Sequence, residues 1–172
     1  MPKINDMGKS SLGIDPGEGG GIALIGSEGE NVFPRTWGPR AKTVQEFWEQ
    51  LSFIGENNSH IVVAVEEQRM RPTTYRDRTG VWHSSVLKST GVLYGSYREA
   101  VAFMVAKGVR YEVVTPQRWQ KALGIPPRKK SEGKTAWKNR LKDHAKRLFP
   151  NVKMTLAVAD AFLLAEYARR TL

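Results

Sequence analysis

The chain has 172 residues, a net charge of +10 and an isoelectric point near 10. This length predicts one domain, residues 1–172, with enough chain to bury a core, and a polar, flexible segment at residues 1–10. The absence of cysteine excludes a disulfide framework and a thiolate zinc site. No apolar run reaches the length of a membrane span and no signal-peptide core is visible, so we expect a soluble intracellular protein with no membrane partner.

The positive charge is concentrated in the middle of the chain. Residues 69–147 contain 19 Lys or Arg against five acidic residues, a net +14 that exceeds the +10 of the whole chain. This asymmetry favours a nucleic-acid partner over charge that serves solubility alone. A membrane surface is the other alternative, but it would require the charge on one amphipathic helix, and here several elements share it.

Five short apolar runs predict strands. The first two, Ser11–Asp15 and Gly20–Ile25, flank a glycine-rich turn that favours a hairpin. His60–Val65 is nearly unbroken and β-branched, which is typical of the middle of a sheet. Weaker runs at Asn31–Trp37 and Tyr111–Val114 complete the set.

The other segments predict five helices and one long loop. Helical spacing and capping residues indicate helices that start at Thr43, cover Thr90–Ala106, run from Thr115 to Gly124, and cover Lys134–Phe149 and Leu156–Arg169. The polar, basic stretch Gln68–Lys88 is expected to be mainly loop. The order of elements predicts an α/β domain, with a mixed five-stranded sheet and helices on both faces.

Three acidic side chains follow or interrupt apolar runs. Asp15 ends the first predicted strand, Glu66 ends the strand His60–Val65, and Asp160 lies inside the apolar last helix. A buried carboxylate is costly unless a cation lies nearby. The alternative for each acid taken singly is a turn former or half of a salt bridge. The three together favour a divalent metal site that cuts a polyanion.

The ligand types indicate which metal. Carboxylate oxygens without cysteine suit Mg²⁺ or Mn²⁺ rather than zinc. Two such ions activate a water and stabilise the leaving oxygen in phosphodiester hydrolysis. We therefore predict Asp15, Glu66 and Asp160 as catalytic residues and metal ligands, with two ions per site.

Basic and aromatic residues alternate after the strand that ends at Glu66, and lysines recur at four-residue spacing on the helix that starts at Lys134. Such groups suit phosphate contacts and stacking on exposed bases. The alternatives are a solvated loop whose Trp82 folds back to the core, and a solvated lysine stripe. The predicted DNA-binding residues are Arg69, Arg71, Tyr75, Arg76, Arg78, Trp82, Lys121, Lys129, Lys130, Lys134 and Lys138.

These motifs, in this order, resemble the RuvC-type Holliday junction resolvases of the ribonuclease H-like superfamily, most closely the phage and organellar branch. The matching segments are Leu12–Gly17, Val65–Gln68, Thr115–Gly124, Leu148–Pro150 and Ala159–Tyr167. Each motif is short and weak alone. Four such motifs, in the family's order and at its separations along the chain, are fairly specific.

The resemblance implies a ribonuclease H-like fold and a homodimer that nicks opposed strands of a four-way DNA junction symmetrically, with Mg²⁺ or Mn²⁺, in DNA recombination and repair. It implies that the loop after Glu66 enters the junction. The cellular setting would be the cytoplasm of a bacterial or phage-infected cell, or an organelle. The apolar residues of Thr90–Ala106 cover much of that helix's circumference, so it could serve both the sheet and a partner subunit.

One departure from the family concerns Ala157. The family usually has an acid or a His at this position, one helical turn before Asp160. Either another group such as Asp143 or a water supplies the missing ligand, or the chain is impaired, which predicts weak cleavage and a gain on Ala157→Asp. The alternatives to a junction-resolving enzyme are a junction-binding protein without turnover and a related nuclease that cuts an RNA–DNA hybrid.

Overall fold

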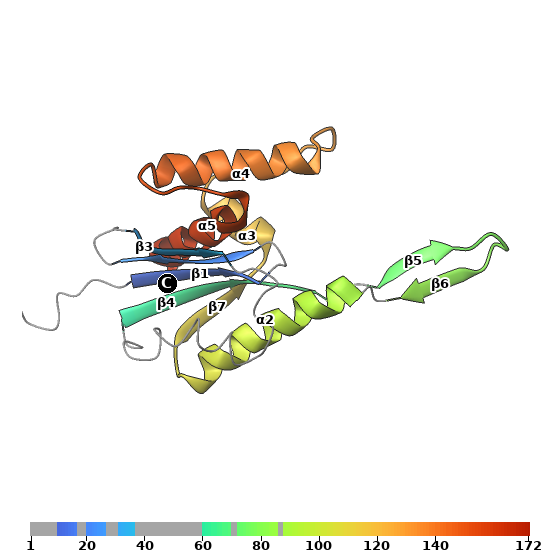
Figure 1. Cartoon of the computed structure of the whole chain (residues 1–172), viewed down its shortest axis with the longest axis horizontal. Helices are drawn as coiled ribbons and strands as arrows, with labels where there is room; N and C mark the ends of the chain where they lie inside the picture. The colour runs from blue at the N-terminus through green and yellow to red at the C-terminus, as the bar shows by residue number, and fades with distance from the viewer. Residues whose placement is uncertain (1–9, 17–19, 27–30, 37–59, 70–71, 86–87) are drawn as a thin grey trace, which may run out of the picture.

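The computed structural model describes residues 10–16, 20–26, 31–36, 60–69, 72–85 and 88–172, and its centre is a five-stranded sheet with the order β3-β2-β1-β4-β7 (Figure 1). Strands β1 to β3 are antiparallel neighbours, whereas β4 pairs parallel with both β1 and β7. The sheet strands are β1 (Ser10–Asp15), β2 (Gly21–Ile25), β3 (Asn31–Thr36), β4 (Ile61–Glu66) and β7 (Arg110–Val114). The predicted mixed sheet is confirmed.

Four helices follow in the described part of the chain: α2 (Lys88–Ala106), α3 (Pro116–Ala122), α4 (Lys134–Leu148) and α5 (Leu156–Thr171). They match the helices predicted there within a few residues, whereas the helix predicted from Thr43 lies outside the described residues. None of the described helices has the length and apolar character needed to cross a membrane.

Both faces of the sheet are covered, because the strand side chains alternate. On β4, Val63 and Val65 face the layer formed by α2, where they share a cluster with Phe103 and Met104. Val62 and Ala64 point the opposite way, into a cluster formed with α3, α4 and α5. Figure 1 shows α5 directly against this second face and α4 outside α5. The predicted helices on both faces are confirmed.

Helix α5 lies unusually close to β1, and Gly13 permits that approach. A Cβ atom at Gly13 would lie 1.9 Å from the carbonyl oxygen of Ala161, which no side chain tolerates. Because the sheet covers one side of α5 and α4 another, the helix is buried from Val158 to Ala168. The close packing fixes Asp160 near the end of β1.

The short helix α3 begins as the sequence predicts. The hydroxyl of Thr115 accepts a hydrogen bond from the backbone N–H of Arg118, 3.3 Å away, and Pro116 occupies the first helical position. Gly124, with φ of 70°, follows the last turn. This geometry directs the fully buried Trp119 toward the sheet.

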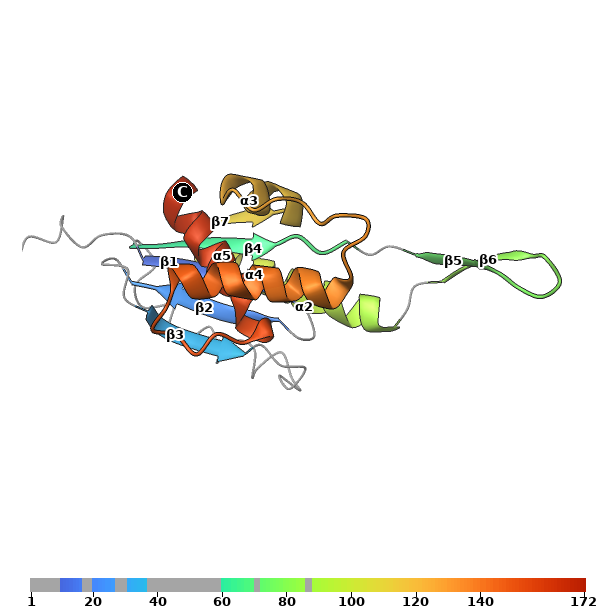
Figure 2. The same cartoon turned by 90° about the horizontal axis from the view of Figure 1, so that it is seen from above.

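The prediction of a loop over Gln68–Lys88 is wrong in its central part. Strands β5 (Thr73–Arg76) and β6 (Trp82–Ser85) form an antiparallel hairpin. Figures 1 and 2 show that it projects beyond the N-terminal end of α2, away from the sheet. The hairpin was missed because its residues are exposed on both faces, so no alternation of apolar and polar residues marks the strands.

Candidate active site

The three predicted acids lie at one edge of the sheet. Asp15 and Glu66 end β1 and β4, and because these strands are parallel neighbours, their carboxyl ends meet at the same edge. Asp160 comes from the second turn of α5, which packs on β1. Asp15 and Asp160 are buried and Glu66 is half-buried. The fold therefore brings together acids that are far apart in the sequence.

Glu66 is held by two hydrogen-bond donors. The indole Nε1 of Trp119 donates to its Oε2 over 3.1 Å, and the amide Nε2 of Gln68 donates to its Oε1 over 3.3 Å. Burial, and after it the negative charges of Asp15 and Asp160, raise the pKa of Glu66 to about 8. The hydrogen bond from Trp119 acts in the opposite direction. A cation bound beside these acids would counter their mutual repulsion and favour the ionised form of Glu66.

Lys138 supplies one positive charge. Its ammonium group, from α4, forms an ion pair with Oδ2 of Asp160, whose side chain is only 4% exposed. Burial favours the neutral amine, but the charge of Asp160 and the hydrogen bond to it outweigh burial and raise the pKa of Lys138. Asp160 therefore forms the salt bridge that is the alternative to a metal-ligand role for each acid taken singly. The second oxygen, Oδ1, is buried and has no hydrogen-bond partner among the residues that the structure describes.

The chemistry of these oxygens fits a hard divalent cation. Carboxylates with few other donors around them are the ligands that Mg²⁺ and Mn²⁺ take. Asp15, Glu66 and Oδ1 of Asp160 are the groups that would hold such an ion. As placed here, however, no group of three or more His, Asp or Glu side chains in the described ranges can hold a metal in common.

Asp143, the side chain considered as a source of a fourth ligand, lies on a different face of α4 from the lysine that pairs with Asp160. Ala157 occupies the second position of α5 and carries no ligand atom. Asp143 is exposed and lines a groove with Arg140 and other residues of α4. It lies about 140° around the helix from Lys138, because five residues correspond to that rotation.

The start of the predicted DNA-binding segment is held by a salt bridge. Arg69 donates from Nε and from a terminal nitrogen to the two oxygens of Glu67, each over 3.0 Å. Glu67 is therefore a structural acid, as its position on the opposite side of the strand from Glu66 suggests. Arg71 lies outside the described residues.

The hairpin exposes aromatic groups on both of its faces. On one face Tyr75 stacks on His83, with ring centroids 5.2 Å apart, and on the other Arg76 lies opposite Trp82. Tyr75 is 52% exposed and Trp82 is 70% exposed. Trp82 does not fold back into the core, so the alternative of a buried tryptophan is wrong.

Asp77 organises the hairpin tip. Its carboxylate accepts hydrogen bonds from the hydroxyl and the N–H of Thr79 and from the N–H of Val81, and it pairs with His83 over 2.6 Å. The hydroxyl of Thr79, followed by His83, lowers the pKa of Asp77 to about 2. Gly80 completes the turn with φ of 88°. The exposed hairpin thus has a defined conformation, with Arg78 exposed at its tip.

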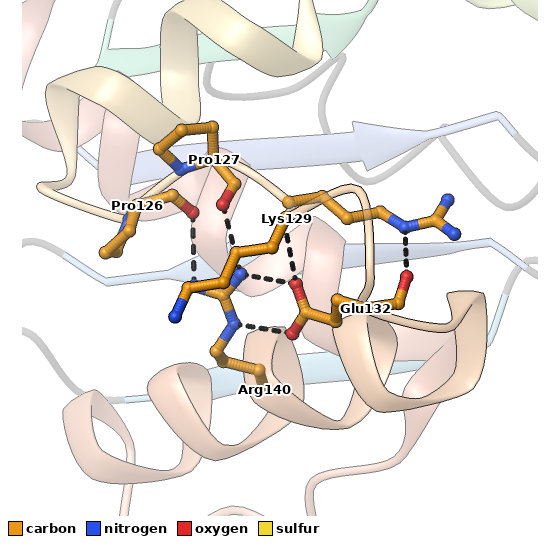
Figure 3. Close-up of polar contacts among 6 residues, drawn as sticks. Pro126, Pro127, Lys129, Glu132 and Arg140 are labelled. Carbon is orange, nitrogen blue, oxygen red and sulfur yellow. Dashed lines mark hydrogen bonds and ion pairs between the residues drawn. The ribbon is translucent and has the colours of Figure 1, made fainter.

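The loop between α3 and α4 is another basic region, and Arg140 holds it in place (Figure 3). The guanidinium of Arg140 donates to both oxygens of Glu132, over 3.0 and 2.8 Å, and to the carbonyl oxygens of Pro126 and Pro127. It also stacks on Trp137, 4.3 Å from the ring centroid. The predicted DNA-binding lysines of this region that remain exposed are Lys121, Lys129, Lys130 and Lys134.

Sequence reasoning missed two features of the site. Trp119 was noted only as part of a motif, although it binds Glu66. Lys138 is predicted to contact DNA, with a solvated lysine stripe as the alternative, whereas in the structure it pairs with a buried acid. Only the helical period of α4, which buries the neighbouring Trp137 and Leu141, could have indicated that Lys138 lies near α5.

Neither a family model nor a curated protein sequence matches the chain. Two solved structures resemble it. The structure of Thermus thermophilus RuvC superposes with a TM-score of 0.57 and 17% sequence identity, over 92% of each chain. T. thermophilus RuvC in complex with a Holliday junction substrate gives a TM-score of 0.58 and 16% identity, over 92% of this chain and 91% of that one.

The chain has the fold of RuvC. The predicted α/β fold with its mixed sheet is therefore confirmed for the described residues, and the likeness is consistent with a ribonuclease H-like fold. Since the sequence identity is low, the likeness to RuvC establishes the fold, and the activity has to be argued from the site.

Proposed function

We propose that this chain is a metal-dependent crossover junction endodeoxyribonuclease, which resolves four-way DNA junctions by paired symmetric nicks. The observation that carries the proposal is the buried Oδ1 of Asp160, which no described residue hydrogen-bonds, at the sheet edge where Asp15 and Glu66 also end their strands. Leaving such an oxygen unsatisfied costs about 1–3 kcal/mol or more. A bound cation would remove that cost.

The chemistry is hydrolysis of a phosphodiester. The oxygen of a water adds to phosphorus, one ester P–O bond breaks, and the proton of the water passes to solvent as the leaving oxygen is protonated. A bound Mg²⁺ or Mn²⁺ lowers the pKa of such a water and neutralises phosphate charge. In this chain Trp119 and Gln68 orient Glu66, and the burial of Asp160 excludes water from its side of the site.

The substrate is proposed from the basic and aromatic surfaces. The hairpin carries exposed Tyr75 and Trp82, and the loop after α3 carries exposed Lys129 and Lys130. A four-way junction offers phosphates on several arms and base faces that a duplex hides, so it would engage both surfaces at once. One of the similar structures, T. thermophilus RuvC, holds a Holliday junction substrate, which supports this choice.

A homodimer is part of the proposal, because one active site cannot nick two opposed strands in one complex. Helix α2 supports it. Phe103 and Met104 face the sheet, while Tyr94 and Val101 are only half-buried and Val105 is 63% exposed. Apolar side chains on this outer side are available to a second copy of the chain. We extend the proposal, on the sequence motifs alone, to the phage and organellar branch of these resolvases and to a role in DNA recombination and repair.

A second candidate is a junction-binding protein without turnover. Ala157 and the pairing of Asp160 with Lys138 favour it, since both reduce the capacity of the site for metal. This candidate keeps the DNA surfaces and loses the hydrolysis.

Three substrates distinguish the candidates: a four-way junction, a linear duplex and an RNA–DNA hybrid, each with Mg²⁺ or Mn²⁺. A resolvase cuts the junction at symmetric positions and shows the mass of a dimer by light scattering. Binding of the junction without cutting would support the second candidate. Cutting of the hybrid in preference to the junction would overturn the proposal in favour of another ribonuclease H-like nuclease.

A further inference from the structure

A groove lies beside the acidic site, at the same edge of the sheet. One wall is formed by residues 67–69, which follow β4, and the other by residues 115–117, which follow β7. Because β4 and β7 are parallel neighbours, both segments leave the sheet at its carboxyl edge, where open α/β sheets bind their ligands. The groove has a volume of about 360 Å³, within the range of small-ligand sites.

Hydrogen bonds fix both walls and connect one of them to the acids. The backbone N–H of Glu67 donates to the carbonyl oxygen of Val114 over 2.9 Å, which extends the contact between the two strands beyond Glu66. On the other wall the hydroxyl of Thr115 caps α3. The amide of Gln68 lines the groove and donates to Oε1 of Glu66 over 3.3 Å. A DNA strand whose phosphate approaches Glu66 therefore has a neighbouring nucleotide within reach of the groove.

The charge of the groove distinguishes it from the other DNA surfaces. Glu67 and Arg69 neutralise each other through two hydrogen bonds of 3.0 Å each. The other described lining residues are neutral, and two of them are the glutamines Gln68 and Gln117. The hairpin and the loop after α3 carry exposed cations that suit phosphates, whereas a groove without net charge suits a neutral group that donates and accepts hydrogen bonds. A nucleobase is such a group.

The glutamines indicate how a base would be recognised. A carboxamide presents a donor and an acceptor side by side, which matches the N6 and N7 atoms of adenine. Gln117 is exposed, because it lies about 200° around α3 from the buried Trp119. We propose that the groove binds a nucleobase of the strand that runs past the acids, with Gln117 as the specificity-determining residue and adenine as the preferred base. This inference rests on the proposed function, which it deepens by naming a feature of the substrate that the site recognises.

Junction binding in EDTA tests the proposal without relying on cleavage. Four-way junctions would carry each of the four bases, or an abasic residue, at each position near the point of strand exchange in turn. Fluorescence anisotropy should show that adenine at one of these positions binds the full wild-type chain about tenfold more tightly than the other bases, as one bidentate amide–adenine pair allows. Gln117→Ala should remove this preference and weaken only the junction that carries adenine there.

Gln117→Glu gives a sharper result, because a carboxylate only accepts hydrogen bonds. Its preference should move to cytosine, whose N4 amino group donates. Gln120→Ala is the matched control: the same change, one turn further along α3, at a residue that lines a neighbouring groove with Lys121. It should keep the preference for adenine. Circular dichroism identifies any variant that fails to fold, and either substitution of Gln117 alone suffices for the test.

The outcomes separate the groove from the nuclease activity. A wild-type chain that prefers adenine in EDTA but cuts no junction with Mg²⁺ or Mn²⁺ would retain the role of the groove and lose the proposed hydrolysis. A chain that cuts junctions but binds all bases equally would retain the hydrolysis and overturn the role of the groove. An equal fall in affinity for every base in Gln117→Ala would also overturn it, and a chain that binds no four-way junction would overturn both.

Discussion

The acidic site and the β5–β6 hairpin are built in opposite ways. The acidic site joins residues from β1, β4, α3, α4 and α5, such as Glu66 and Trp119, which lie 53 positions apart in the sequence. The hairpin is held by short-range bonds around Asp77, and all eight of its strand residues are exposed. The buried charged groups of the acidic site thus depend on the tertiary fold. The exposed surface of the hairpin needs only local structure.

The difference has an energetic consequence. Burying the acids raises the free energy of the folded state unless a cation compensates, so stability and activity should change together at the acidic site. The hairpin buries little, so changes there should alter DNA binding and leave stability almost unchanged. The following predictions test that contrast, beginning with the largest expected effect.

The largest effect concerns the pH dependence of stability without metal. Between pH 4.5 and about 8 folded Glu66 keeps a proton that the unfolded chain has lost. The unfolded state then binds fewer protons, so the free energy of unfolding falls as pH rises through this range. The fall is at most about 5 kcal/mol, because one pKa unit corresponds to about 1.4 kcal/mol. Denaturant unfolding in EDTA from pH 5 to 8.5 measures it.

Glu66→Gln is the matched control for this titration. It cannot ionise, so the fall in stability with pH should largely disappear in the variant. An equal pH slope in the two proteins would show that Glu66 does not carry the effect.

The next effect concerns the indole of Trp119. Trp119→Phe keeps most of the buried volume and removes the donor to Glu66. A hydrogen bond to a charged group contributes about 1.5–3 kcal/mol, so the Mn²⁺ concentration for half-maximal thermal stabilisation should rise at least about tenfold. Trp137→Phe changes a buried tryptophan of the same core cluster and is the control. Equal effects of the two substitutions would show that packing alone matters.

The third effect concerns the hairpin. Replacing Tyr75 and Trp82 together by Ala should reduce the ratio of junction to duplex affinity by about tenfold, given about 1–3 kcal/mol for stacking of one base. Because both side chains are exposed, the melting temperature should stay within about 2 °C. Val81→Ala, at an exposed site beside Trp82, serves as the control. A fall of junction and duplex affinity by the same factor would contradict a role in sensing the junction.

The smallest effect concerns the loop that Arg140 holds. Arg140→Lys keeps the charge but cannot bond both Glu132 oxygens and two proline carbonyls at once. The phosphate contacts proposed for Lys129 and Lys130 should weaken, and DNA affinity should fall by roughly threefold, with no change in sequence preference. Fluorescence anisotropy with junctions of two sequences measures this, and unchanged affinity for both would contradict the role of the loop.

The sheet and the described helices could be predicted because their signals are local. The β-branched run at β4, the cap at Thr115 and the burial period of α4 depend on a few neighbouring residues. The hairpin was missed although it is also local, because its stabilising bonds use the polar side chains of Asp77 and Thr79 and not an apolar face.

The acids of the site could be predicted, but their partners could not. A carboxylate at the end of a buried strand is visible in the sequence, whereas the donor that reaches it from another helix is not. Trp119 and Lys138 are identified only by the packing of α3 and α4 against the sheet and α5. Without that packing, the sequence does not indicate that Trp119 contacts Glu66 or that Lys138 contacts Asp160.

The most direct test of the proposed function is cleavage of a four-way junction, labelled on each strand in turn, in Mn²⁺ by the wild-type chain and by Asp160→Asn. The wild-type chain should nick two opposed strands at symmetric positions. Asp160→Asn should cut at least about a thousandfold more slowly, since metal-assisted catalysis contributes several kcal/mol. It should bind the junction as well as the wild type or better, because a negative charge near the phosphate is gone and Lys138 loses its carboxylate. Absence of cleavage by the wild-type chain, or equal cleavage by both proteins, would contradict the account.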